Sequence, residues 1–111
     1  MNIKTEALPK LKQAINKTTG ILPIDVEKLV LFGSYARGEQ NIYSDIDIAI
    51  VYKDNYTFFR QQEALFQQEL QEQFSDNIEI NFFRTTENKT GGANDFIKKE
   101  GITLWERGIA T

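Results

Sequence analysis

The stretch Gly33-Ser34-Tyr35-Ala36-Arg37-Gly38, followed closely by Ser44-Asp45-Ile46-Asp47, decides the fold of this chain. The four apolar residues directly before it are typical of a buried strand, which Gly33 would end. Ser34 is a favoured N-cap residue, so a short helix is predicted to begin there. A strand that turns directly into a helix presents backbone N–H groups and the positive end of the helix dipole. This arrangement suits a phosphate group.

Two aspartates begin the apolar run that follows. Residues 45–51 predict a strand in which Asp45 and Asp47 face one side and the intervening isoleucines face the other. Two carboxylates side by side on a buried strand repel each other and resist desolvation, and a cation between them removes both costs. Hard oxygen ligands favour magnesium or manganese over zinc. The sequence therefore predicts a nucleotidyl-transfer site, with a triphosphate at the Gly33-Ser34 turn.

The composition restricts the chemistry that this chain can perform. The 111 residues are expected to form a single domain over residues 1–111. The absence of cysteine and histidine excludes disulfides, thiolate metal sites and histidine acid–base chemistry, so a metal ion must be bound by oxygen. The net charge is −3 and no basic stripe is visible, which argues against direct binding of nucleic acid.

No part of the sequence indicates a membrane segment or an export signal. No apolar run approaches the roughly 20 residues that a spanning helix needs. The first six residues also lack the apolar core of a secretory signal. We therefore expect a cytoplasmic protein that does not bind a membrane.

Hydrophobic periodicity predicts the remaining elements. The expected helices span residues 5–17, 34–39, 56–74 and 93–100, and the expected strands span residues 28–32, 45–51 and 78–83. These elements predict an α/β fold with a small mixed sheet flanked by helices. One face of the sheet must be covered by the apolar helix stripes, and the other face is expected to bear the metal site.

Three residues around the aspartates have further predicted roles. Arg37 would attract a triphosphate, and the alternative is a solvated arginine on the surface. Ser44 either hydrogen-bonds near the metal ligands or only starts the strand. Gly38 is expected to adopt a backbone conformation that is open mainly to glycine.

The motif resembles that of the nucleotidyltransferases of the DNA polymerase beta superfamily, which is Gly-Ser, a spacer, then Asp-x-Asp. Gly33-Ser34, ten intervening residues and Asp45-x-Asp47 are similar to the small stand-alone branch, the minimal nucleotidyltransferases (MNT). The resemblance implies a polymerase beta-type core that binds ATP and two magnesium ions. Gly33, Ser34, Arg37 and Ser44 would then contact ATP, while Asp45 and Asp47 bind the metal ions.

The family also carries a third carboxylate, usually an aspartate, on a neighbouring strand. Glu79 lies at the matching position of this chain and departs from the pattern by one methylene. The resemblance therefore implies that Glu79 is a catalytic residue, either as the third metal ligand or as a base acting through water.

Stand-alone members of this family resemble the antitoxin half of HEPN/MNT toxin–antitoxin pairs. The resemblance implies a protein adenylyltransferase that transfers AMP from ATP to a hydroxyl, expected to be a tyrosine, of a cognate HEPN ribonuclease toxin. One alternative is a non-catalytic antitoxin that masks the toxin by binding alone. Another is a small-molecule nucleotidyltransferase of the aminoglycoside type, for which so short a chain has little spare surface. The wall that holds the acceptor is expected to come from the toxin or from a second copy of the chain in a homo-oligomer.

Overall fold

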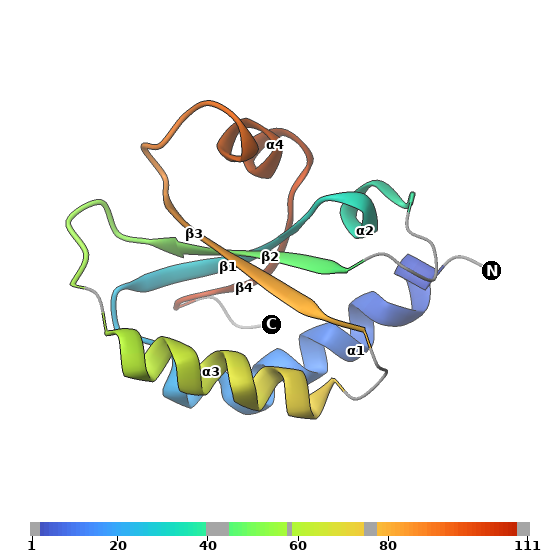
Figure 1. Ribbon diagram of the computed structural model, residues 1–111, viewed down its shortest axis with the longest axis horizontal. Helices are drawn as coiled ribbons and strands as arrows, with labels where there is room; N and C mark the ends of the chain where they lie inside the picture. Colours follow the sequence, from blue (N-terminus) through green and yellow to red (C-terminus); the bar gives the residue numbers. More distant parts are fainter. Residues whose placement is uncertain (1–2, 40–44, 58, 75–77, 109–111) are drawn as a thin grey trace.

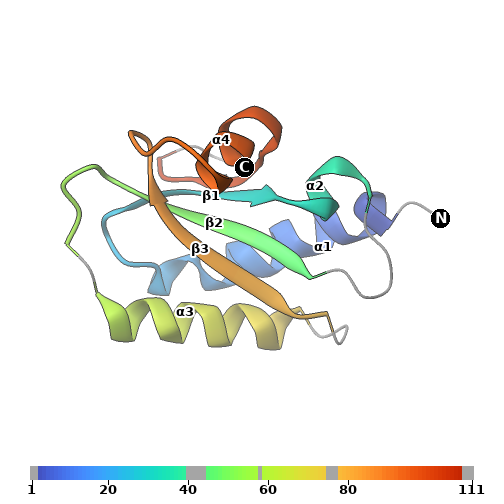
Figure 2. The same cartoon turned by 45° about the horizontal axis from the view of Figure 1, so that its top comes forward.

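The computed structural model describes residues 3–39, 45–57, 59–74 and 78–108, which form one sheet with helices on both faces (Figures 1 and 2). The elements are α1 (Ile3–Thr18), the 3-10 helix η1 (Thr19–Ile21), β1 (Val26–Phe32), α2 (Ser34–Arg37), β2 (Ile46–Tyr52), α3 (Arg60–Gln73), β3 (Ile80–Thr86), α4 (Ala93–Glu100) and β4 (Ile102–Glu106). No helix of the described part is long and apolar enough to span a bilayer.

The sheet has four strands in the order β3-β2-β1-β4. β1 is antiparallel to both β2 and β4, whereas β2 and β3 are parallel. The predicted α/β class with a mixed sheet is therefore confirmed. The strand β4 was not among the predicted elements, and it forms the edge of the sheet beside β1.

Helices α1 and α3 cover one face of the sheet (Figure 1). Leu11 and Ile15 of α1, and Phe66 and Leu70 of α3, are at most 1% exposed. They pack on the apolar side chains of the strands, including Ile48 of β2. The predicted apolar stripes thus form much of the main core, but Phe59 and Leu65, which were expected in the stripe of residues 56–74, are exposed. Helix α3 begins at Arg60, whereas the sequence predicted a start at residue 56.

A buried ionic group also joins α3 to the sheet. The Glu63 carboxylate is only 6% exposed and accepts two hydrogen bonds from Arg84, at 3.0 Å from Nε and 2.7 Å from Nη2. The Tyr52 hydroxyl donates to the same carboxylate. Every oxygen of this buried anion therefore has a partner, which offsets the cost of taking it out of water.

The opposite face of the sheet carries α4 (Figure 2). Ile97 of α4 packs on Val30, Ala49 and Val51 in a second, smaller apolar cluster. Because side chains alternate along a strand, the face that bears Ala49 and Val51 is also the face of Asp47. The fold therefore keeps Asp47 away from the main core, on the side of the sheet where the site was expected.

Candidate active site

Gly33 connects β1 to α2 in a conformation that requires glycine. Its backbone angles are φ 77° and ψ −156°, a region that is essentially closed to residues with a Cβ. A Cβ added at Gly33 would also collide with Oδ2 of Asp47. The reason for this proximity is the pairing of Phe32 with Asp47 across β1 and β2. Gly33 therefore lets the turn lie directly against the second aspartate.

Helix α2 is a single turn of residues 34–37 whose N-cap is Gly33. The expected cap at Ser34 is wrong, because the Gly33 carbonyl already accepts the first helical hydrogen bond, from Arg37 N at 3.2 Å. The helix also ends two residues earlier than predicted. Gly38, at φ 75° and ψ 20°, closes it in the left-handed region, which confirms the expected glycine conformation.

Arg37 is engaged with two carboxylates in this structure. Its Nε lies 3.0 Å from Glu39 Oε2 and its Nη1 lies 3.5 Å from Glu100 Oε2. The hydrogen bond with Glu39 raises the pKa of Arg37. Burial raises the pKa of Asp47, and the Arg37 charge opposes this rise as the smallest of the effects on that carboxyl. A triphosphate that bound Arg37 would compete with these carboxylates, and the ATP contact of Arg37 stays a prediction.

Asp45 and Asp47 lie together with an asparagine that the sequence had not indicated as a site residue. The parallel register of β2 and β3 places Asn81 opposite Asp47. Asn81 Nδ2 donates to Asp45 Oδ2 at 3.0 Å. Burial raises the pKa of Asp47, a hydrogen bond from Asn81 opposes that effect, and the Asp45 charge adds to it. The two carboxylates therefore interact with each other, and both lie beside the amide of Asn81.

Glu79 lies directly before β3. This strand starts at Ile80, whereas the sequence predicted a start at residue 78. Its backbone carbonyl accepts a hydrogen bond from Ile46 N at 2.9 Å, while the residue itself is exposed. Among the described residues, no three acidic side chains lie close enough together to hold a metal ion. The role of Glu79 stays a prediction, and Ser44 lies outside the described residues.

The donor set fits a hard divalent cation. Asp45 and Asp47 offer carboxylate oxygens, and Asn81 carries an amide oxygen beside them. Magnesium prefers such oxygen ligands, and it commonly binds through one or two carboxylates with the remaining positions left to phosphate and water. Asp45 and Asp47 are therefore the residues that would hold the metal ion, next to the Gly33 turn.

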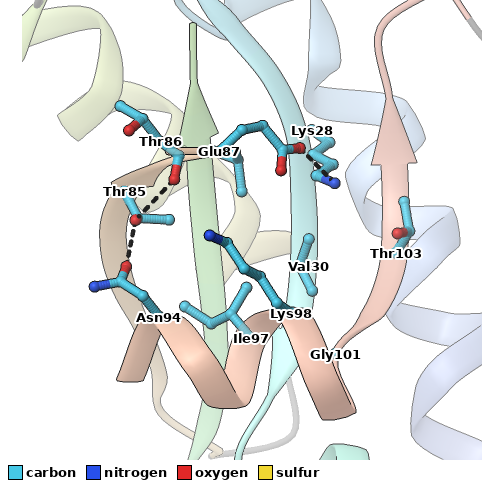
Figure 3. A pocket seen from close by; sticks show the side chains of 11 residues that line it. Lys28, Val30, Thr85, Thr86, Glu87, Asn94, Ile97, Lys98, Gly101 and Thr103 are labelled. Carbon is cyan, nitrogen blue, oxygen red and sulfur yellow. Dashed lines mark hydrogen bonds and ion pairs between the residues drawn. The ribbon is translucent and has the colours of Figure 1, made fainter. Parts of the chain in front are cut away.

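A hollow of about 250 Å³ lies between α4 and the sheet, away from the two aspartates and toward the other end of β2 and β3 (Figure 3). Two lysines line it, and both are engaged with protein groups. Lys28 forms an ion pair with Glu87 at 2.6 Å, and Lys98 Nζ donates to the Lys89 carbonyl at 2.7 Å. Both lysine charges therefore contact the loop before α4. This hollow is consequently a poorer candidate for a ligand site than the aspartate site.

Comparison with known proteins gives the family. The family model described as "Polymerase beta, Nucleotidyltransferase" matches residues 10–109, which is most of the chain. The chain belongs to this family. The predicted family is thereby confirmed, and the Gly33-Ser34 turn and the two aspartates of the nucleotidyltransferase motif lie inside the matched region.

Individual relatives match this nucleotidyltransferase domain over only part of their length. A candidate protein adenylyltransferase of Methanocaldococcus jannaschii is 42% identical over 52 residues, covering 45% of this chain and 52% of the relative. The chain thus spans about half the length of that relative.

Two solved structures share the fold. A toxin–antitoxin with AMP-PNP matches at a TM-score of 0.62 and 22% identity, over 87% of this chain and 74% of that one. A tri-AMPylated HEPN toxin of Shewanella oneidensis in complex with MNT antitoxin matches at a TM-score of 0.51 and 19% identity. That match covers 86% of this chain and 72% of the other.

Proposed function

We propose that this nucleotidyltransferase domain transfers AMP from ATP to a hydroxyl of a HEPN-type toxin and thereby acts as its antitoxin. The observation that carries the proposal is the Gly33 turn packed against Asp47, with Asp45 beside it, in a chain of the polymerase beta family. Support for the protein acceptor comes from the relative named for protein adenylylation and from the fold shared with an AMPylated toxin complex.

Each part of the turn and strand has a task in this reaction. The Gly33-Ser34 turn would bind the β- and γ-phosphates, and Arg37 would add positive charge beside them. Asp45 and Asp47 would hold two magnesium ions. When bound, these ions supply neutralisation of the charge on the attacking and leaving oxygens. The rate enhancement would come mainly from positioning and electrostatic stabilisation, as in other phosphoryl transfers.

The transfer step forms one bond and breaks one bond. The acceptor oxygen, which we propose to be that of a tyrosine, attacks the α-phosphorus of ATP, and pyrophosphate leaves. The hydroxyl proton passes to a carboxylate of the site, either directly or, for Glu79, through water. The added adenylate brings negative charge to a ribonuclease surface that must bind RNA phosphates, so repulsion and steric blockage would inhibit the toxin.

A non-catalytic antitoxin is the second candidate function. It is favoured by the position of Glu79, which does not join Asp45 and Asp47 in a three-carboxylate cluster in this structure. Such a protein would neutralise the toxin by covering its surface, and the aspartates would then be dispensable for neutralisation.

Intact-mass measurement of the toxin separates these two functions. We expect the adjacent reading frame to encode the HEPN-type toxin, and co-expression with it to increase the toxin mass by one or more adenylates. Asp47→Asn should abolish the increase while the complex still forms. Asp54→Asn is the matched control, because Asp54 accepts a hydrogen bond from Asn88 away from the site. Full modification by the Asp47→Asn variant would disprove the mechanism, and neutralisation without any mass increase would favour the masking function.

A further inference from the structure

One amide side chain lies beside both aspartates of the candidate active site. Asn81 Nδ2 donates to Asp45 Oδ2 at 3.0 Å, and Asn81 is the partner of Asp47 in the parallel register of β2 and β3. A carboxylate only accepts hydrogen bonds, so the amide must present its NH₂ group to it in this state. Asn81 thereby places an uncharged polar group beside two like charges that repel each other.

The position of Asn81 is set by its neighbours on β3 rather than by its own hydrogen bond. Ile80 is 7% exposed and belongs to the main core, and Phe82 packs against the same core and contacts the ring of Phe66. These two residues anchor the strand and leave Asn81 exposed on the opposite face. Solvent screens a hydrogen bond at this exposed position, so the bond between Asn81 and Asp45 adds less to stability than the same bond would in the core.

We propose that Asn81 is the third, uncharged ligand of the metal site. Its amide group hydrogen-bonds Asp45 in the metal-free protein, beside Asp47, and its amide oxygen binds the cation when the ion is present. The inference rests on the proposed function, because it names a further ligand of the same site. An amide carbonyl is an accepted ligand for hard cations, and turning the amide over exchanges its NH₂ group for its oxygen. The same side chain can therefore serve the site with and without the metal ion.

An uncharged third ligand changes the metal affinity of the site. Two carboxylates and an amide bring two negative charges to the cation, where three carboxylates would bring three. The repulsion in the metal-free protein is smaller, and the attraction for the cation is also smaller. Replacing Asn81 by aspartate should therefore tighten cation binding, whereas removing the amide should weaken it.

The experiment measures Mn²⁺ affinity in the presence of a non-hydrolysable ATP analogue, by the electron paramagnetic resonance signal of free Mn²⁺. We expect Asn81→Leu to weaken binding about tenfold or more, the range found when partners of metal sites are removed. Asn81→Asp should strengthen binding and lower the melting temperature of the metal-free protein. Asn88→Leu is the matched control, because Asn88 Nδ2 donates to Asp54 Oδ2 at 2.6 Å in a similar exposed pair elsewhere. It should bind Mn²⁺ like the wild type.

The change in Mn²⁺ affinity has opposite signs in the two Asn81 variants if Asn81 is a metal ligand. If Asn81 had only a structural role, both substitutions would change the affinity in the same direction. Affinity unchanged in Asn81→Leu, or not strengthened in Asn81→Asp, overturns the proposal. Asn81→Ala carries the same expectation as Asn81→Leu and replaces it if the leucine variant does not fold. If Glu79→Gln weakens Mn²⁺ binding and Asn81→Leu does not, Glu79 is the third metal ligand instead.

A failure of this inference is distinguishable from a failure of the proposed function. If Asp47→Asn abolishes Mn²⁺ binding while Asn81→Leu keeps it, only the role of Asn81 is disproved. If Asp47→Asn binds Mn²⁺ and nucleotide like the wild type, the aspartate site itself is disproved, and the proposed function and this inference fall together.

Discussion

At the scale of single residues, Gly33 is the one on which the geometry of the site depends most directly. Its φ of 77° with ψ of −156° excludes most other residues, and the space for a Cβ is already taken by the Asp47 carboxylate. Gly38 shares a positive φ, at 75°, but an added Cβ there meets open space. Gly38 also lies in the more tolerant left-handed region, at ψ 20°, so a side chain costs less there in backbone strain as well as in space.

Gly33→Ala should lower the free energy of unfolding by about 2–4 kcal/mol, because backbone strain and the collision with Asp47 act together. Gly38→Ala is the control and should lose only about 1 kcal/mol, the cost of a left-handed conformation. Urea unfolding of both variants measures the difference. Equal losses would show that the turn does not press against Asp47 as the structure indicates.

At the scale of elements, α3 is attached to the sheet by the group of Tyr52, Glu63 and Arg84. Burial and then the hydrogen bond to Glu63 raise the pKa of the Tyr52 hydroxyl well above its ordinary value. The folded protein therefore keeps a proton that the unfolded chain loses near pH 10. The stabilisation is complete below about pH 10 and is lost as the pH rises beyond it.

Tyr52→Phe should consequently change both the stability and its dependence on pH. Below about pH 10 the variant should be less stable by roughly 1.5–3 kcal/mol, the usual contribution of a hydrogen bond to a charged group. Above that pH the wild type should lose up to about 1.4 kcal/mol per pH unit more than the variant. Urea unfolding from pH 8 to pH 11 measures both curves. Curves that stay parallel would contradict the assigned proton.

The elements that the sequence predicts correctly have local signals. The apolar run of β1, the glycine that ends it and the alternation of β2 are all local features, and these two strands form much as expected. The five residues of β4 become a strand by pairing with β1, which is distant in the sequence. Asn81 likewise enters the site through the register of β2 with β3. Register is a property of two paired strands, so neither strand predicts it alone.

At the scale of the whole molecule, the two faces of the sheet have different tasks. Helices α1 and α3 close one face with the main core, and α4 packs on the other through a smaller cluster. The start of β2 remains beside the α2 turn, with Asp45 and Asp47 half-buried there. The fold therefore presents two carboxylates and a turn from one side only, and this is an incomplete cage for a magnesium ion.

This incomplete cage predicts that cation and nucleotide bind as a unit. Magnesium gives up its water reluctantly, so we expect no binding at micromolar Mg²⁺ without nucleotide. Mg²⁺ together with an ATP analogue at about 100 times its Kd should stabilise the fold by about 2.7 kcal/mol. Scanning calorimetry with Mg²⁺ alone, analogue alone and both together measures the linkage, and Asp47→Asn should show no joint shift. If Mg²⁺ alone raises the Tm as much as the pair does, the cage is already complete in the free protein, and the phosphates are not its missing ligands.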